Sequence, residues 1–314
     1  MSLRLAIRTD GSTSIGLGHV MRCGALANAL LAEGAQVVWL TTTPQHQPAD
    51  LDPGIKRITL GSEAELVPAL DRLAIKHVVA DWKVTEPDRV AALRAGGRHV
   101  SLIGNFLHGA VPDLHVRQGF LPALSPSGAA TLSGPKYLLL SKAYQGLPAR
   151  LVADRATRIL LSLGGTTTPV LARIRDRLST AFGALDVEWR GPAATGTIPP
   201  LAEALRRADI GILAGGTTLH EAAATGLPAL CVPIAPNQLE RAEQFESVGL
   251  GISLNPDDPG FDRQFDSALN ALVLDREHRT MMARTGQALV DGAGAARVAR
   301  HLIGLAAAVR QESQ

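Results

Sequence analysis

The chain has 314 residues, of which 46% are hydrophobic, 19% charged and only 4% aromatic. A single core usually stops growing at about 250–300 residues, so two domains with aliphatic cores are expected. The net charge of +2 and the lack of a basic block argue against nucleic-acid binding. Two distant cysteines, Cys23 and Cys231, are expected to be reduced and buried in a cytoplasmic protein. Neither a secretory signal nor an apolar run of about 18 residues is found, so no membrane span is expected.

The first half is predicted to repeat strand–helix units, which is typical of a parallel sheet. We expect strands at 3–9, 35–40, 55–60, 77–81, 98–103 and 137–140. Helices are expected from His19 to Gly34, over 62–73 and over 86–94. Ser62 and Glu65 have the spacing of a capping box for the second helix. The stretch 104–134 is rich in Pro, Ser and Gly and is predicted to be irregular.

The second half restarts this rhythm after a predicted linker at 145–154. Strands are expected at 158–163, 187–190, 210–213 and 229–232. Helices are expected from Pro169, over 201–207, from about Leu219, over 237–248, and from about Phe261 and Ala295. The sequence therefore predicts an α/β protein with two doubly wound parallel-sheet domains, 1–147 and 155–294, facing a cleft. The final helix, 295–314, could pack back on the first domain.

The first candidate motif is the glycine-rich loop from Asp10 to the helix that His19 opens. Glycines allow a close approach of backbone to ligand, and a helix start offers free N–H groups. The loop lacks the dinucleotide fingerprint, because Met21 stands where its third glycine would be. The positive end of the helix favours a neutral imidazole at His19, as a general base requires. The alternative is a histidine with a purely structural role.

Two further glycine motifs lie in the second half. Residues 214–221 end in Glu221, and their glycine pair between strand and helix is suited to a diphosphate. Glu221 could accept both ribose hydroxyls, or it could only stabilise the helix dipole. Asn237 and Gln238 could contact the ligand or cap a helix. The loop 163–168 could close over phosphate or form only a tight turn.

Other catalytic patterns are missing from the sequence. It has no HExxH motif, no Walker lysine and no nucleophile elbow. His108 and His115 have no convincing partner in the irregular stretch, so neither a metal nor a cofactor is expected.

Residues 8–22 resemble the opening signature of the PseG/SpsG family, which includes UDP-sugar hydrolases of pseudaminic acid biosynthesis. The matching residues are Arg8, Asp10, Ser12, Ile15, Gly16, Gly18, His19 and Arg22. The similarity continues in order at 134–140, 163–166, 208–221, 226–228 and 237–238. It implies a GT-B fold similar to that of the glycosyltransferase MurG.

The resemblance also implies roles for single residues. His19 matches a base that activates water for attack on the anomeric carbon, so that the bond to UDP breaks with inversion and without a metal. Asp10 and Asp81 are assigned to the catalytic set with it. The substrate-binding set comprises Gly16, Gly18, Arg22, Lys83, Asn105, Gly164, Gly165, Thr166, Gly215, Gly216, Thr217, Thr218, Glu221, Asn237 and Gln238.

The sequence departs from the family on the side where the sugar should lie. Lys83 stands where a tyrosine is usual, and Gly104 and Asn105 replace a usual pair of aspartates. Three functions therefore stay open. The first is a UDP-sugar hydrolase in pseudaminic acid or surface polysaccharide biosynthesis, and the others are a glycosyltransferase and a silent nucleotide-sugar binding protein. A monomer or weak homo-oligomer is expected.

Overall fold

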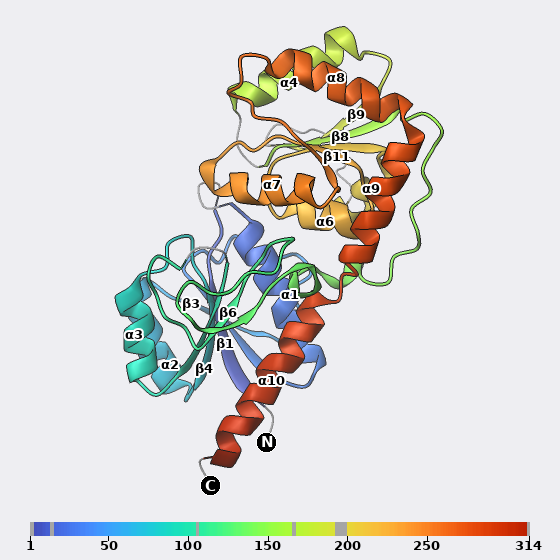
Figure 1. Cartoon of the computed structure of the whole chain (residues 1–314). Helices are drawn as coiled ribbons and strands as arrows, with labels where there is room; N and C mark the ends of the chain where they lie inside the picture. Colours follow the sequence, from blue (N-terminus) through green and yellow to red (C-terminus); the bar gives the residue numbers. More distant parts are fainter. Residues whose placement is uncertain (1–2, 13–15, 105–106, 165–167, 192–199, 313–314) are drawn as a thin grey trace. The chain divides into compact units, whose positions relative to one another are not determined.

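The computed structural model describes residues 3–12, 16–104, 107–164, 168–191 and 200–312. It divides into two compact units, residues 1–142 with 292–314, and residues 143–291 (Figure 1). Each unit contains one sheet, and every strand pair in both sheets is parallel. Parallel strands buried on both faces explain the aliphatic composition.

The sheet of the first unit has seven strands in the order β3-β2-β1-β4-β5-β6-β7. Their bounds are β1 (Arg4–Thr9), β2 (Gln36–Thr41), β3 (Lys56–Thr59), β4 (His77–Asp81), β5 (His99–Ile103), β6 (Leu114–Val116) and β7 (Ala130–Leu132). From β1 the chain adds β2 and β3 toward one edge of the sheet, and from β4 it adds β5, β6 and β7 toward the other edge. The order therefore reverses between β1 and β4, and such a switch point is where doubly wound sheets bind ligands.

Helices cover both faces of this sheet: α1 (Gly18–Ala32) and α10 (Gly294–Glu312) on one, α2 (Leu66–Arg72) and α3 (Pro87–Ala95) on the other. Alternate residues of β1 serve the two cores. Leu5 and Ile7 pack with α1 and α10, while Ala6 between them packs with the opposite core. This alternation is the two-residue period of a strand.

The sheet of the second unit has five strands in the order β12-β11-β10-β8-β9. Their bounds are β8 (Arg158–Ser162), β9 (Asp186–Trp189), β10 (Ile210–Leu213), β11 (Ala229–Cys231) and β12 (Gly251–Ser253). Here the order reverses between β8 and β10. The two predicted glycine loops of this half follow these two strands, so both lie at its switch point.

The helices of this unit are α4 (Pro169–Ala181), α5 (Leu201–Arg207), α6 (Thr218–Thr225), α7 (Leu239–Ser247), α8 (Phe261–Leu274) and α9 (Arg276–Leu289). Figure 1 shows α4 and α8 on one face of the sheet and α6 on the other. The Thr168 hydroxyl caps α4 by accepting a hydrogen bond from the Leu171 N–H at 3.2 Å, and Pro169 occupies its first turn.

Two arginines, the half-buried Arg150 and the buried Arg279, anchor the segment that was predicted as a linker. Arg150 donates to the carbonyls of Leu205, Ala208 and Thr225, at the ends of α5 and α6. Arg279, 1% exposed, donates to carbonyls at the end of α8 and to Ala153 and Asp154. Cations at helix C-termini satisfy the free carbonyls there. Residues 150–154 are therefore held firmly on the second unit.

The structure corrects several sequence predictions. Three strands were missed, β6, β7 and β12; each has only three residues, and none lies in a continuous apolar run such as the one that marks the equally short β11. Helix α9 was also missed; Asp275 ends α8 and caps α9 by accepting from the His278 N–H. The predicted strand 137–140 is wrong. The Gln118 side chain instead satisfies the backbone at Tyr137 and Leu139, so no strand pairing is needed.

The predicted capping box at the second helix is also wrong. A short 3-10 helix, Glu63–Glu65, precedes α2, and the Ser62 side chain makes no capping bond. The Glu65 carboxylate accepts from the Gly61 N–H at 2.9 Å, one residue before the expected partner. The tighter first turn explains this shift, because it moves the carboxylate relative to the Ser62 backbone.

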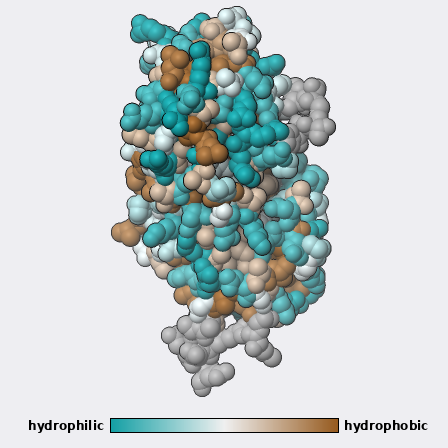
Figure 2. All heavy atoms as spheres, turned by 90° about the vertical axis from the view of Figure 1, so that its right-hand side faces the viewer, coloured by the Kyte–Doolittle hydropathy of each residue, from teal (hydrophilic) through white to brown (hydrophobic). Residues whose placement is uncertain are grey.

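The face of the molecule in Figure 2 is mostly hydrophilic, with small, separated hydrophobic areas. Exposed large apolar side chains include Leu124 at 87% and Leu151 at 96% exposure, one in each unit. Within the described part of the chain, no helix has both the length and the apolar character needed to cross a membrane.

Candidate active site

The switch point of the first unit brings His19 and Asp81 together. Strands β1 and β4 are neighbours, and Thr9 at the end of β1 pairs with Asp81 at the end of β4. The chain continues from β1 through the glycine loop into α1, where His19 is the second residue. Parallel strands place their carboxyl ends at the same edge, so this loop and Asp81 meet there.

His19 and Asp81 form a hydrogen-bonded pair, with 2.7 Å between Nδ1 and Oδ1. An ionised carboxylate can only accept, so Nδ1 carries the proton. The Arg22 nitrogen 3.0 Å from Nδ1 is then a close approach and not a hydrogen bond. The other ring nitrogen, Nε2, is left with its lone pair free in the neutral ring. This is the tautomer that a histidine base needs, and the side chain is 19% exposed.

Arg22 holds Asp81 in its ionised form. Its Nε and Nη2 donate to the two carboxylate oxygens at 2.6 and 2.7 Å, and the Cys23 thiol lies 3.6 Å from Oδ2. Burial by itself would raise the pKa of Asp81, but the Arg22 charge and the His19 contact hold it below its ordinary value. Arg22 was predicted to bind substrate; in the structure its guanidinium contacts Asp81 and is 9% exposed, and the prediction stays untested.

Asp10 is engaged entirely with the protein. Its Oδ2 accepts from Arg8 at 2.6 Å, and its Oδ1 accepts from the Thr41 hydroxyl at 2.9 Å and the Thr42 N–H at 2.7 Å. Burial opposes ionisation, but the Arg8 guanidinium and these donors hold the pKa of Asp10 well below its ordinary value. Asp10 therefore carries a fixed negative charge with both oxygens used.

The switch point of the second unit consists mainly of backbone. Gly215 follows β10; its N–H donates to the Gln238 Oε1 at 3.2 Å, and its carbonyl accepts from Arg241 at 2.7 Å. A Cβ at Gly215 would lie 2.7 Å from the Cβ of Gln238, so no larger residue fits. Next to it, Gly216 has nothing within 4 Å of a Cβ. The Thr217 side chain does not cap α6. The Leu219 and His220 N–H groups donate to the Gly216 and Thr217 carbonyls, so the candidate donors to an anion are the N–H groups just before Leu219.

Glu221 lies in the first turn of α6 and receives hydrogen bonds from the Thr218 and Tyr144 hydroxyls. Burial raises the pKa of Glu221 to about 7, although these two hydroxyls favour the charged form. A carboxyl group of this pKa changes charge near neutral pH. A further hydrogen-bond donor beside Glu221 would therefore stabilise its charged form.

The remaining predicted residues line the same sheet edges or lie outside the described residues. Gly16, exposed with φ at 88°, precedes Gly18, the first residue of α1; Lys83 is exposed two residues after β4. In the second unit, Gly164 follows β8 with φ at 94°, and Asn237 is exposed in a 3-10 turn, Pro236–Gln238. Gln238 uses its side-chain oxygen on Gly215 and Ile234. Outside the described residues are Asn105, Gly165 and Thr166.

Sequence reasoning missed four residues that support these sites: Thr41, Thr43, Glu63 and Tyr144. Thr41 ends β2 and Thr43 follows it, a position at a strand end that could have marked both. Tyr144 is one of only two tyrosines in the chain and is 4% exposed. Nothing in the sequence links Glu63 to Arg8, since 55 residues separate them.

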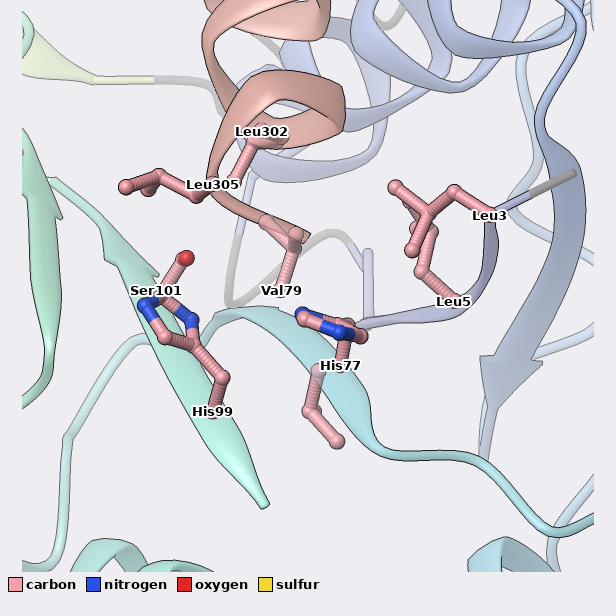
Figure 3. Close-up of a pocket in the computed structure, with 9 residues that line it drawn as sticks. Leu3, Leu5, His77, Val79, His99, Ser101, Leu302 and Leu305 are labelled. Atoms are coloured by element: carbon pink, nitrogen blue, oxygen red, sulfur yellow. The ribbon is translucent and has the colours of Figure 1, made fainter. Parts of the chain in front are cut away.

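Figure 3 shows a cavity that belongs to neither site. It lies at the amino ends of β1, β4 and β5, with His77 and His99 facing Leu302 and Leu305 of α10. Its volume of about 10 Å³ is roughly what one water needs and far below that of a nucleotide. Across the described residues, no cluster of three or more His, Cys, Asp or Glu side chains is arranged to hold a metal ion.

Known proteins resemble this chain along almost its whole length. The chain is 23% identical to the spore coat polysaccharide biosynthesis protein SpsG of Bacillus subtilis (strain 168), over 94% of this chain and 96% of that protein. The chain is SpsG-like. No protein-family model matches it.

Solved structures identify the fold of this SpsG-like chain. MurG of Acinetobacter baumannii matches with a TM-score of 0.68 at 18% identity, covering 96% of this chain and 99% of that one. The Streptomyces sp. SF2575 glycosyltransferase SsfS6, complexed with thymidine diphosphate, matches with a TM-score of 0.61 at 15% identity, covering 95% and 99%. The predicted GT-B fold, with its two parallel-sheet domains, is confirmed.

Proposed function

We propose that the chain hydrolyses the anomeric C–O bond of a UDP-linked amino sugar, releasing UDP and the free sugar. The observation that carries this proposal is the His19–Asp81 pair. The pair leaves one imidazole nitrogen available as a base at the ligand-binding edge of a doubly wound sheet. Water is the nucleophile, His19 Nε2 takes its proton, and the oxygen attacks the anomeric carbon.

Asp81, held by Arg22, orients His19 for its role as the base. As the ring gains a proton it becomes a cation, and the fixed carboxylate 2.7 Å from Nδ1 stabilises that charge. Arg22 keeps Asp81 from accepting the proton itself, because the guanidinium binds both of its oxygens. The buried carboxylate therefore orients and stabilises the imidazole without becoming protonated.

The leaving group is stabilised by the second unit in this proposal. The diphosphate accepts hydrogen bonds from the start of α6, beyond Gly215, Gly216 and Thr217, where the positive end of the helix meets its negative charge. Glu221 accepts the ribose hydroxyls. A leaving group stabilised in this way needs no proton from the protein, which is consistent with a single base.

The relatives support this proposal at a coarser level. SsfS6 holds a nucleoside diphosphate in the same fold, which supports nucleotide binding here. The name of the Bacillus subtilis relative supports a place in the biosynthesis of a surface polysaccharide. A soluble enzyme acting on UDP-sugars in the cytoplasm is the form that we propose.

The second candidate is a glycosyltransferase, in which an acceptor hydroxyl replaces water. The fold neighbours favour it, since several of them are glycosyltransferases by name. A silent binding protein is the third candidate.

The deciding experiment measures UDP release from a panel of UDP-, CMP-, GDP- and dTDP-sugars without an acceptor. We expect release from a UDP-sugar, no release by His19→Ala, and nearly unchanged UDP affinity of this variant by calorimetry. Release that requires an added acceptor would identify a transferase. UDP binding without release under either condition would identify a binding protein, and full activity of His19→Ala would exclude His19 as the base.

A further inference from the structure

We propose that Asp10 is a positioning residue, which acts through Thr43 and Gly11 to set the first turn of α1 and with it the imidazole of His19. The inference rests on the proposed function, because it assigns Asp10 a role in the same reaction. It replaces the expectation that Asp10 takes part in the chemistry itself.

The first step is the connection from Asp10 to the loop after β2. The Oδ1 of Asp10 accepts from the Thr41 hydroxyl and the Thr42 N–H, and the Thr43 hydroxyl lies 3.4 Å from it. The Thr43 N–H donates in turn to the Thr41 hydroxyl at 3.0 Å. These bonds fix residues 41–43 against the end of β1.

The loop after β2 in turn holds the glycine loop. The Thr43 Oγ1 accepts a hydrogen bond from the Gly11 N–H at 3.0 Å. Asp10 and Gly11 are thus held from the same side by three consecutive threonines. A backbone N–H bound in this way fixes where the chain leaves β1.

The third step is the contact between Gly11 and α1. A Cβ on Gly11 would lie 3.0 and 3.1 Å from the two terminal methyl carbons of Val20. Val20 is 1% exposed and directly follows His19. Gly11 does not have a positive φ, so its lack of a side chain serves this close contact and not an unusual backbone conformation. The position of Gly11 therefore limits how α1 begins.

Arg8 ties this arrangement to a third loop. Its guanidinium, 1% exposed on β1, binds Asp10 Oδ2 and also Glu63, with 2.5 Å between Nη2 and Oε2. Glu63 belongs to the 3-10 turn after β3. One buried cation thus joins the loops after β1 and β3, while Asp10 itself joins those after β1 and β2. Preorganisation of this kind holds a base near its productive geometry.

These contacts argue against a direct chemical role for Asp10. Each of its carboxylate oxygens already accepts from the protein, and the side chain is 17% exposed. A group that acts as base or nucleophile needs an oxygen that reaches the substrate.

The test is steric and uses two residues that do not titrate. Gly11→Ala adds a methyl group against Val20, and Gly11→Ala/Val20→Ala removes the obstruction. We expect Gly11→Ala to lower kcat by about tenfold with little change in KM, since small displacements of a catalytic group are costly. The double variant should recover most of kcat. Because the double variant also relieves overpacking, thermal unfolding of both variants is measured so that a loss of kcat is separated from a loss of stability.

Thr43→Val provides an independent test with a matched control. It removes the hydroxyl that holds Gly11, and kcat should again fall. Thr131→Val is the control, since the Thr131 hydroxyl also accepts from one backbone N–H, but it lies within β7 and donates to the Ala129 carbonyl. This control should keep full activity. Normal kcat in Thr43→Val, or a double variant no more active than Gly11→Ala, would overturn the proposal.

A spectroscopic readout separates this inference from the proposed function. ¹⁵N NMR of the His19 ring reports which nitrogen carries the proton, whether or not any sugar is hydrolysed. We expect the Nδ1–H form to dominate in the wild type and Thr131→Val, and to give way to a mixture in Gly11→Ala and Thr43→Val. Unchanged ring signals in both of these variants would overturn the positioning role, even if hydrolysis by His19 were established.

Discussion

The two switch points of this molecule consist of different chemical groups. In the first unit, ionised side chains are locked together, with Arg22 on Asp81 and Arg8 on Asp10. In the second unit, backbone groups beside Gly215 and the start of α6 predominate, with the single carboxyl of Glu221. The difference follows from the tasks proposed for them. Moving a proton requires a few charges held rigidly, whereas a diphosphate is bound by many N–H donors and a helix dipole.

The site in the first unit also has the larger desolvation cost, because its charged side chains are buried. Burying two ions costs several kcal/mol for each, and only good geometry between them compensates for it. The contacts of Asp81 with Arg22, at 2.6 and 2.7 Å, meet this requirement. A site of this type tolerates substitution poorly, while the backbone site depends mainly on the room that its glycines leave.

The largest effect is expected from Asp81→Asn. It removes the charge that stabilises the protonated His19 ring and no longer enforces the tautomer, so kcat should fall by about 10³-fold. UDP affinity should stay within about twofold of the wild type, since Glu221 and Gly215 are untouched. Steady-state kinetics and calorimetry measure the two effects.

Asp209→Asn is the matched control for Asp81→Asn. Asp209 also binds an arginine, Arg158, and accepts from two backbone N–H groups, but at the opposite end of the second sheet from Gly215. It should leave kcat unchanged. Equal losses of kcat in the two variants would mean that Asp81 acts only through stability.

An intermediate effect is expected from the two glycines before α6. Gly215→Ala should lower both Tm and UDP affinity, because its methyl group would overlap Gln238. Gly216→Ala has open space and should leave the Tm of the free protein unchanged. The UDP affinity of Gly216→Ala should nevertheless fall about tenfold if the diphosphate occupies that space. Thermal unfolding and calorimetry distinguish the two variants. Unchanged UDP affinity in Gly216→Ala would show that the diphosphate does not bind beside Gly216.

The smallest effect concerns the pH dependence of UDP binding. The pKa of Glu221 is raised to about 7, so this group is increasingly ionised as the pH rises through that value. Ribose hydroxyls bind best to the ionised form, and UDP affinity should therefore increase a few-fold from about pH 6 to about pH 8. Glu221→Gln should bind UDP more weakly and without this trend. A trend that persists in Glu221→Gln would assign it to another group.

The same shift has a consequence for stability with the opposite sign. A folded pKa above the ordinary value of 4.5 means that the folded form binds the proton more tightly than the unfolded chain. The contribution of Glu221 is therefore complete below about pH 4.5 and is lost as the pH rises through 7. Gln at this position does not titrate, so the free energy of unfolding of Glu221→Gln should fall less than that of the wild type as the pH rises through 7. Thermal unfolding at two pH values measures this difference.

Much of the architecture was readable from the sequence, because its elements have strong local patterns. Strand β10 and helix α5 have the predicted bounds, and the glycine loops lie at the carboxyl ends of strands as expected. Three-residue strands were readable only where, as in β11, they lie in a continuous apolar run. Three residues such as Gly251–Ser253 show no period, and they become a strand only because β11 lies alongside.

The candidate site divides in the same way. The sequence by itself determined which residue types follow each strand: His19 at the start of a helix, Gly215 and Gly216 before another, Asp81 at the end of β4. Only the tertiary structure decided their partners. Arg22 contacts Asp81, Asp10 holds the loop after β2, and Tyr144 donates to Glu221. The physical reason is that hydrogen bonds and ion pairs form between residues far apart in the chain, whose meeting depends on strand order.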